Sequence, residues 1–405
     1  MRILQDSAQR NVLLFLAVVL SLAFYSFIGI DIVLPRVPHG FDFMHFYSGI
    51  LALKLGIRDI YSGEEYEALA TQLSQGRWHM TNSYFPGFYV FMLPLSGLSF
   101  DDAYLAFTAV TLLSYLLITA WLGQQLFRQR PLGAVAGIGL GVFSIYTGAG
   151  IDCLALGQVG FAIAALVSLA YLLSRRNQPL LAGAVLGASA LVKAWPAFLI
   201  LYFLSRKLWK SVFGFFLGYC LPCLMAACLW GVSSYPYLFR ALKALGYQPN
   251  RVNQSLTGWL TYCCGLDLAT TRLLHGVLGV LLVAGLAVLH HRKPRFPRAL
   301  QYGLYLICAC ILAPWSWPHH RVVLIFPLIA LLERTTRRKG YWDWLGASSL
   351  ATLLLLDGEI MIDRVFAYLH FRAAESGMIF ILMVCSCFCI VAAGWNDEER
   401  ETPGA

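Results

Sequence analysis

Four short polar motifs interrupt an otherwise apolar chain. They contain Asp42 in GFDF, Lys193 in LVKAWP, Asn253-Gln254-Ser255, and His319-His320-Arg321. Charged and polar groups are costly to keep at membrane depth, so they tend to mark sites of chemistry or transport. Together the motifs supply a carboxylate, cations and amide groups. Such a set suits a reaction in which a hydroxyl loses its proton while a phosphate leaves.

Asp42 is the candidate general base of this set. It lies between Phe41 and Phe43, shortly after the first apolar run, where partial loss of hydration favours uptake of a proton. A carboxylate in such a loop more often caps a helix or is simply solvated, so the residue pattern by itself leaves both interpretations open.

Lys193 lies in the apolar stretch ASALVKAWPAFLI, close to Pro196. Its ammonium could bind a phosphate oxygen that arrives from the lipid side. Alternatively, the side chain could extend to the membrane interface without a ligand. The nearby proline predicts a helix break rather than an ordinary helix end, and the two interpretations stay equally weighted.

The segment APWSWPHHR combines aromatic and basic residues. Neighbouring histidines could hold a metal, but no third or fourth ligand follows at a recognisable spacing, so we predict no zinc site. Hydrogen bonds from His319, His320 and Arg321 to phosphate or sugar hydroxyls are favoured instead. Of Trp315 and Trp317, one is expected in an aromatic belt at the interface, and the other is left open as a stacking platform for a sugar ring.

The segment PNRVNQSLTGWL adds a possible phosphate partner, Arg251, and amide donors at Asn253 and Gln254. A loop turn followed by a helix N-cap would account for the same residues. Asn253 also opens a glycosylation sequon, but nothing else in the chain indicates a eukaryotic secretory protein.

The composition identifies the elements that must position these motifs. Of 405 residues, 59% are hydrophobic and 13% are charged, whereas soluble domains average about 25% charged residues. We therefore predict an all-α polytopic membrane protein in which residues 1–405 form one integral domain. The net charge of +9 belongs to short basic loops rather than to a basic stripe on a soluble domain, so no nucleic acid is expected as a partner.

A membrane-spanning helix needs about 20 mostly apolar residues. Predicted spans are 12–30, 103–124, 132–150, 157–174, 208–230, 271–289, 299–314, 322–333, 344–362 and 377–394. The region 179–205 adds two short crossings that meet at Lys193, which gives about twelve spans. Glycines at small-xxx-small spacing, such as Gly133-Gly137-Gly141 and Gly214-Gly218, predict close helix packing. The run 12–30 is longer than a signal-peptide core, so we expect it to be retained.

The basic loops set the predicted orientation. They cluster at 128–130, 175–176, 206–210, 292–298 and 334–339, and the positive-inside rule puts these loops and the tail 396–405 in the cytoplasm. An odd number of crossings must then separate the first external loop, 31–83, from Arg175, yet four apolar segments lie between them. The shortest segment, 84–98, is broken by prolines and is predicted to be re-entrant. All four polar motifs then face outward.

The first external loop is predicted to contain amphipathic helices. Phe43, Phe46, Tyr47 and Ile50 recur at helical spacing, and a second set recurs from Tyr66 to Leu73. Such helices can lie along the membrane interface.

In their order and spacing the motifs resemble glycosyltransferase family 87, membrane enzymes of the GT-C type that use polyprenyl-phosphate-linked sugars. The resemblance is carried by DFMHFYSGILALKLGIRDIY, NSYFPGFYVFMLPLSGL, LVKAWPAFL, NQSLTGWL and APWSWPHHR. It implies that Asp42 is the catalytic base. It also implies contacts to the donor phosphate or sugar from Lys193, Arg251, Asn253, Gln254, His319, His320, Arg321, Tyr84 and Trp317.

The same resemblance implies an activity and a location. A sugar, mannose as the first expectation, would pass from a polyprenyl-phosphate donor to a glycolipid or glycan acceptor at the external face of a bacterial cytoplasmic (inner) membrane. One carboxylate fits inversion in a single displacement, because retention needs a second carboxylate close by. Asp59, Glu64, Asp101 and Asp102 are the acidic residues considered for that role, and no motif supports them. No cofactor is expected, and the residues do not decide whether a divalent cation assists.

The alternative class is a membrane transporter or lipid flippase, in which broken helices and intramembrane charges mark a translocation path. The chain has no internal repeat, and its polar motifs gather at one face rather than at the midplane. These two features favour the enzyme.

Overall fold

The computed structural model describes residues 40–61, 63–74, 82–127, 130–245, 253–337, 340–356 and 374–395. Every regular element within these ranges is a helix, which confirms the predicted all-α class for this part of the chain. Three predicted features lie outside the described residues: the apolar run 12–30, Arg251 and the tail 396–405.

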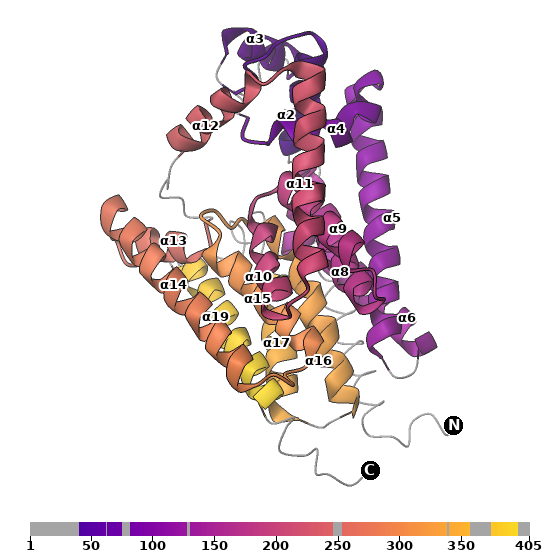
Figure 1. The fold of residues 1–405 in the computed structure, drawn as a ribbon, viewed down its shortest axis with the longest axis vertical. Coiled ribbons are helices and arrows are strands. Elements are labelled where there is room, and N and C mark those ends of the chain that lie inside the picture. Colours follow the sequence, from indigo (N-terminus) through magenta and orange to yellow (C-terminus); the bar gives the residue numbers. More distant parts are fainter. Residues whose placement is uncertain are drawn as a thin grey trace.

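The chain runs through many helices of unequal length (Figure 1). The first half comprises α2 (Phe41–Lys54), α3 (Glu64–Leu73), α4 (Pro86–Met92), η3 (Leu93–Gly97), α5 (Phe100–Leu126), α6 (Arg130–Ile145), α7 (Gly148–Leu156), α8 (Gly160–Arg175) and α9 (Pro179–Val192). The second half comprises η4 (Trp195–Leu199), α10 (Ile200–Ser205), α11 (Trp209–Trp230), α12 (Ser234–Leu245), α13 (Leu256–Gly258), η5 (Trp259–Cys263), α14 (Leu268–Arg292), α15 (Arg298–Leu312), η6 (Pro318–Leu324), α16 (Ile325–Arg337), α17 (Tyr341–Leu356) and α19 (Ala374–Trp395).

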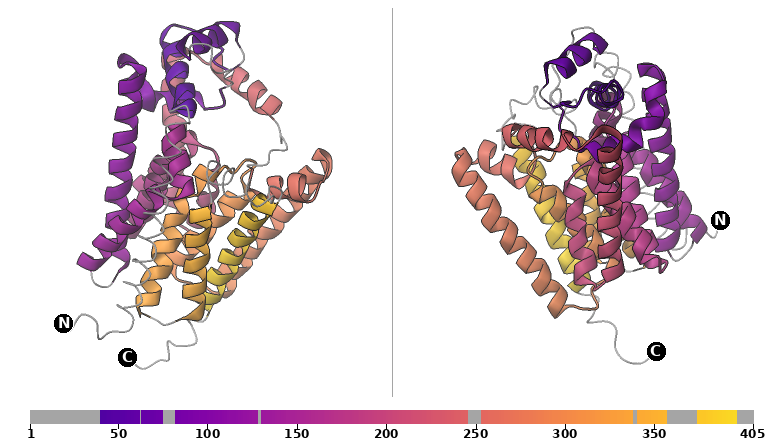
Figure 2. Two further views of the ribbon diagram at one scale, coloured as in Figure 1. Left: turned by 180° about the vertical axis from the view of Figure 1, so that it is seen from behind. Right: turned by 45° about the horizontal axis from the view of Figure 1, so that its top comes forward.

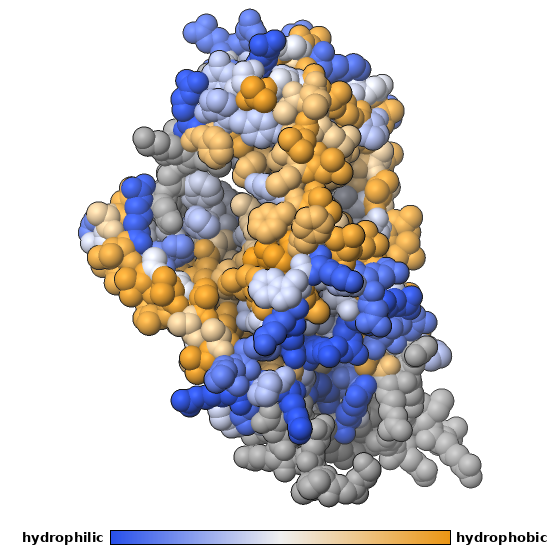
Figure 3. Space-filling model, viewed as in Figure 1, coloured by the Kyte–Doolittle hydropathy of each residue, from blue (hydrophilic) through white to orange (hydrophobic). Residues whose placement is uncertain are grey.

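Several of these helices are built to cross a bilayer. By length and composition, α5, α11, α14 and residues Gly377–Trp395 of α19 each qualify, and the bent pair α6–α7 adds a fifth candidate among the described residues. Their outward side chains are mostly apolar, and Figure 3 shows an apolar band between two polar zones on one face of the molecule. The chain is therefore a membrane protein, as its composition predicted.

The predicted span 132–150 is wrong in one respect. Helix α6 ends at Ile145, and α7 starts at Gly148 with an axis bent by 67° from that of α6. Thr147 accepts a hydrogen bond from the Gly150 amide at 3.3 Å and so acts as the N-cap of a new helix. The bend directs α7 toward η6, where it contributes to the site described below.

Small residues bring two helix pairs into close contact, as their spacing predicted. A Cβ added at Gly137 would overlap the carbonyl of Thr119 in α5, and one added at Gly214 would overlap the carbonyl of Leu180 in α9. Only residues without a side chain allow these backbones to approach so closely. Helices α5 and α6, and likewise α9 and α11, therefore pack as tight pairs.

Helices α2, α3, α4 and α12 lie together at one end of the bundle, and we call this region the cap (Figures 1 and 2). The apolar residues predicted for the first loop form one buried set: Phe43, Phe46 and Ile50 are fully buried against α3, α4 and α5. Helix α2 therefore packs inside the protein instead of presenting these side chains to lipid.

The predicted basic loops gather at the end opposite the cap. Arg206 donates to the carbonyl of Phe296 at 2.9 Å, and Arg337 donates to the carbonyl of Leu126 at 3.1 Å. The first contact joins the loops after α10 and α14, and the second joins the ends of α16 and α5. The side of the membrane that this end faces stays a prediction.

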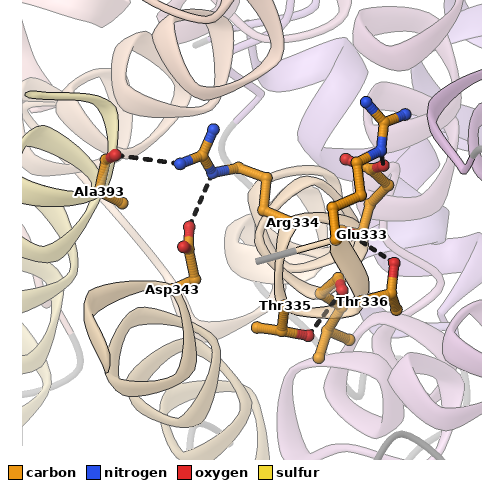
Figure 4. A network of polar contacts seen from close by, with 8 residues as sticks. Glu333, Arg334, Thr335, Thr336, Asp343 and Ala393 are labelled. Atoms are coloured by element: carbon orange, nitrogen blue, oxygen red, sulfur yellow. Dashed lines mark hydrogen bonds and ion pairs between the residues drawn. The ribbon is translucent and has the colours of Figure 1, made fainter. Parts of the chain in front are cut away.

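At the same end, an ion pair connects neighbouring helices (Figure 4). Arg334 of α16 donates through Nε to Asp343 of α17 at 2.7 Å, and through Nη2 to the carbonyl of Ala393 in α19 at 3.0 Å. One half-buried guanidinium thus fixes three helices relative to one another.

Candidate active site

A cavity of about 770 Å³ lies between the cap and the helix bundle. It is lined from five places in the chain: the start of α2, the segment 83–85, the end of α7, the junction of α9 with η4, and the segment 313–320. Asp42, Lys193, His319 and His320, the residues for which sequence predicted chemistry, all line it.

The start of α2 fixes the position of Asp42. The amide of Gly40 donates to the carbonyl of Ala155 at 2.9 Å, which joins the first turn of α2 to the last turn of α7. Helix α7 ends at Leu156, and the residue after it, Gly157, has a φ of +68°, the left-handed conformation that commonly terminates helices. Because the two helix ends are held together, the next residue, Gln158, lies beside Asp42.

Gln158 donates from Nε2 to Oδ2 of Asp42 at 2.6 Å. The Gln158 Oε1 atom accepts from the amide of Val159 at 3.4 Å, which agrees with the NH₂ group facing the carboxylate. Such charge-assisted bonds are shorter and stronger than bonds between neutral groups. The carboxylate of Asp42 is therefore anchored through one of its two oxygens.

Tyr84 closes this side of the cavity. Its backbone carbonyl accepts from the hydroxyl of Tyr61 at 2.7 Å, and its amide donates to Oδ1 of Asn82 at 3.1 Å. Its ring packs edge-on against Phe46, with centroids 4.7 Å apart. Burial, reinforced by the charge of Asp42, raises the pKa of the Tyr84 phenol, so this hydroxyl stays protonated and can donate a hydrogen bond.

Lys193 enters the cavity where a helix stops. Helix α9 ends at Val192, and Lys193 adopts an extended conformation just before Pro196 opens η4. A proline cannot continue the hydrogen-bonding pattern of the preceding turn. The predicted helix break at this point is confirmed, and it aims the ammonium into the cavity rather than along the helix surface.

Lys193 meets two imidazoles. Its Nζ lies 3.0 Å from Nε2 of His319 and 2.7 Å from Nε2 of His320. Burial first, and then the charge of Lys193, lower the pKa of both imidazoles well below the usual range, so both are neutral. Burial lowers the pKa of Lys193 to about 8, against an opposing effect of the Asp42 charge.

The proton positions in this cluster follow from a further bond. The amide of Trp317 donates to Nδ1 of His320 at 3.3 Å, which puts the proton of the neutral imidazole on Nε2, the atom facing Lys193. A lysine amine can accept that proton's hydrogen bond, whereas an ammonium cannot. With a pKa of about 8, Lys193 exchanges between amine and ammonium near neutral pH, and the ammonium is the form that attracts an anion.

Aromatic rings complete the walls. Trp195, Trp315 and Trp317 line the cavity, and Trp317 stacks on His319 with centroids 6.5 Å apart. Among the described residues the buried indole Nε1 of Trp195 has no hydrogen-bond partner. Flat apolar faces with one donor suit a sugar ring, although tryptophans also occur at membrane interfaces without a ligand.

The remaining predicted contact residues do not line the cavity. Asn253 is buried and donates to the carbonyl of Pro314 at 2.9 Å, while its Oδ1 accepts from the Ser316 amide at 3.0 Å. Gln254 is joined to the same segment through its backbone amide, and Arg321 is fully buried behind the two histidines. The side chain of Asn253 and the backbone of Gln254 thus hold the segment 314–316 of the wall, and Arg251 lies outside the described residues.

Three cavity residues were missed from the sequence. Gln158 belongs to no recognisable motif. Asp152 is a charged residue inside the apolar run GAGIDCLAL, and a charge in an apolar context is the same signal that selected Lys193. His45 lies one turn after Asp42 in α2, and burial lowers its pKa despite the nearby carboxylate. Its Nδ1 has no hydrogen-bond partner within the described residues. The cavity therefore holds a second carboxylate and another neutral imidazole.

No group of three or more acidic, histidine or cysteine residues in the described ranges is arranged to hold a metal ion. The Nε2 atoms of the two cavity histidines face the Nζ atom of Lys193 and not a common point where a metal ion could bind. The donor set is that of a site for anions and hydroxyls.

A helical membrane protein with a carboxylate, a lysine–histidine cluster and tryptophans in one cavity has groups that suit proton transfer and the binding of anions and sugar rings. The family model of glycosyltransferase family 87 matches residues 82–327, which is more than half of the chain, and the chain belongs to that family. It is therefore a membrane glycosyltransferase. Searches of curated proteins and of solved structures gave no match.

Proposed function

We propose that this glycosyltransferase transfers a sugar from a polyprenyl-phosphate donor to a hydroxyl of a glycolipid or glycan acceptor. The observation that carries the proposal is the composition of one cavity, in which the anchored carboxylate of Asp42 faces the same space as the Lys193–His319–His320 cluster. The first group suits removal of a proton, and the second suits a phosphate.

The reaction is a single displacement. The acceptor hydroxyl gives its proton to Asp42 while its oxygen forms a bond to the anomeric carbon. The bond from that carbon to the phosphate oxygen breaks, and its electron pair leaves with polyprenyl phosphate. Lys193 neutralises the negative charge that grows on the leaving phosphate, where a positioned cation in a water-poor site is most effective.

The location of the cavity supports a lipid donor. Lys193 lies between the short helices α9 and η4, and His319 lies in η6, at breaks in otherwise apolar helices. A long prenyl chain cannot leave the bilayer without losing about 0.8 kcal/mol per CH₂ group. A site at the end of membrane helices allows the headgroup to enter while the chain stays in lipid.

The finer topology belongs to the same proposal. About twelve spans, with 84–98 as a re-entrant segment, put the cap and the cavity on the external face of a bacterial inner membrane. In its support, α4 has only 7 residues and η3 only 5, too few to cross a bilayer as one straight helix. Mannose is the first sugar to test.

Asp152 bears on the stereochemistry, because it brings a second carboxylate to the cavity wall. We propose inversion, with Asp152 binding sugar hydroxyls rather than forming a covalent intermediate. In support, Asp152 lies in the middle of α7, whereas Asp42 is the carboxylate at the helix start with a neutral donor anchoring it.

The test is a transfer assay on the purified protein. Polyprenyl-phosphate mannose, glucose and arabinose are supplied one at a time with a short glycolipid acceptor, with and without EDTA. One of the three is expected to yield product, and NMR of the new linkage gives its anomeric configuration. Transfer only from nucleotide sugars would contradict the lipid donor, and retention would assign Asp152 a covalent role.

A further inference from the structure

The position of Asp42 in the chain does not by itself fix the orientation of its carboxylate. It occupies the first turn of α2 after Gly40, a residue that has no side chain to cap the helix. A hydrogen bond from Gln158, 116 residues further along the chain, holds the Asp42 carboxylate instead.

The segment that carries Gln158 is built rigidly. Gly157 has φ +68°, and a Cβ at this position would lie 2.6 Å from Cβ of Phe43 and 2.8 Å from the ring of Tyr104. The hydroxyl of Tyr104 also donates to the carbonyl of Leu154 at 2.5 Å. The end of α7 is thus pressed against α2, and the Gln158 side chain is only 6% exposed.

Only an NH₂ group can face a carboxylate at this distance, because the amide oxygen would repel it. The amide occupies one lone pair of Oδ2, so Oδ1 is the more available oxygen for the proton of an acceptor hydroxyl. A base that is fixed through one oxygen presents the second in one direction, and orientation of this kind contributes to rate by limiting unproductive geometries.

We infer that Gln158 is a positioning residue for the general base: its amide holds Oδ2 of Asp42 so that Oδ1 takes the proton of the acceptor hydroxyl. The inference rests on the proposed function, in which Asp42 is that base. The family assignment says nothing about Gln158, whose proposed action is through Asp42 and not directly on the substrate.

Other charged and titratable groups also face Asp42. His45 comes from α2, Tyr84 from the segment before α4, Asp152 from α7 and Lys193 from the α9–η4 junction. The variants used to test Gln158 must therefore change its donor group while leaving these four residues in place.

Two variants of similar size separate donation from packing. Gln158→Met keeps the volume and removes the donor, so kcat is expected to fall about 10-fold or more at every pH, with KM for the donor lipid unchanged. Gln158→Glu puts a second carboxyl against Asp42, and two such groups share one proton rather than both ionising. Its kcat is expected to approach the wild-type value at low pH and to fall as rising pH removes the shared proton.

The matched control is Gln301→Met in α15. Gln301 is another buried amide, 3% exposed, and it donates to Nδ1 of His290 at 2.8 Å, away from the cavity. Loss of this amide is expected to leave the pH profile unchanged. A wild-type pH profile in Gln158→Glu together with a wild-type kcat in Gln158→Met would overturn the inference.

A second measurement does not need turnover. The infrared band of the Asp42 carboxylate is identified by its loss in Asp42→Asn, and its frequency is followed in Gln158→Met at one fixed pH. The carboxylate stretch is expected to shift, because one oxygen has lost its hydrogen-bond donor. An unmoved band overturns the positioning role even if no sugar is transferred, whereas a moved band without any transfer contradicts only the proposed function.

Discussion

In the proposed reaction Asp42 takes up a proton and so loses its negative charge, while Lys193 balances the charge that develops on the leaving phosphate. The clearest consequence concerns Asp42→Asn, which keeps the shape and cannot accept the proton. Removal of a general base typically costs about 10²- to 10⁴-fold in rate. We expect kcat to fall by that factor while binding of the donor lipid is kept, as measured by transfer kinetics and by equilibrium binding of labelled donor.

The control for this variant is Asp59→Asn in the same loop region. Asp59 accepts from the amide of Tyr61 at 3.1 Å and does not line the cavity. It should keep wild-type turnover. Equal losses in both variants would mean that the effect arises from the fold of the cap and not from the base.

Lys193 gives the pH dependence. Its pKa is lowered to about 8 by burial, and only the protonated amine attracts a phosphate. Affinity for the donor should therefore be full below about pH 7 and fall as the pH rises through about 8. Lys193→Arg removes the titration, since guanidinium stays charged. The alkaline limb of kcat/KM should disappear in this variant, even if its overall rate is lower, and a persistent limb near pH 8 would assign the titration elsewhere.

At the level of single residues, the sequence was informative where a charge stood in an apolar context. Lys193, His319 and His320 were predicted on that basis and line one cavity. Gln158 could not be found this way. An uncharged amide costs less free energy to bury than a charge, and its partner Asp42 is 116 residues distant. Asn253 and Gln254 were selected for their type, yet they support the wall instead of lining the cavity.

Helix breaks, more than whole helices, bring the site together. The break at Lys193 was predictable because Pro196 cannot continue a helix. The bend between α6 and α7 was not, because Thr147 at a cap differs little from Thr within a helix until the chain around it is known. The span 132–150 is therefore predicted as one helix, and Asp152, two residues beyond its end, is not singled out.

Gly157 tests the importance of the junction after α7. Gly157→Ala forces a side chain into the left-handed region, at a cost of about 1–2 kcal/mol, and into contact with Phe43. Both effects push Gln158 away from Asp42, so the variant should lower the Tm and reduce kcat more than the loss of stability explains. Gly139→Ala in α6, with nothing within 4 Å of the added Cβ, should change neither. An active, stable Gly157→Ala protein would show that the junction tolerates movement.

Across the whole molecule, charge is sorted along one axis. Basic loops meet at the end opposite the cap, through contacts such as Arg206 with the carbonyl of Phe296 (Figure 1), and the cap residue Asp42 lines the cavity. Composition and the positive-inside rule predicted this sorting because each depends on many residues at once. The predicted number of spans, in contrast, depends on single short segments. Helices α4 and η3 together have 12 residues, and so short a segment does not show whether the chain crosses the membrane there.

Labelling decides that remaining point of topology. In a chain whose other accessible cysteines are replaced, Ser99→Cys is expected to react in intact cells with a membrane-impermeant maleimide, because Ser99 caps α5 at the cap end. Lys207→Cys, in the loop after α10, should react only after permeabilisation. Glu65→Cys in α3, which precedes 84–98, supplies the comparison. Reaction of Glu65→Cys and Ser99→Cys from the same side means that 84–98 returns to the side from which it entered. Reaction of the two positions from opposite sides would require 84–98 to cross.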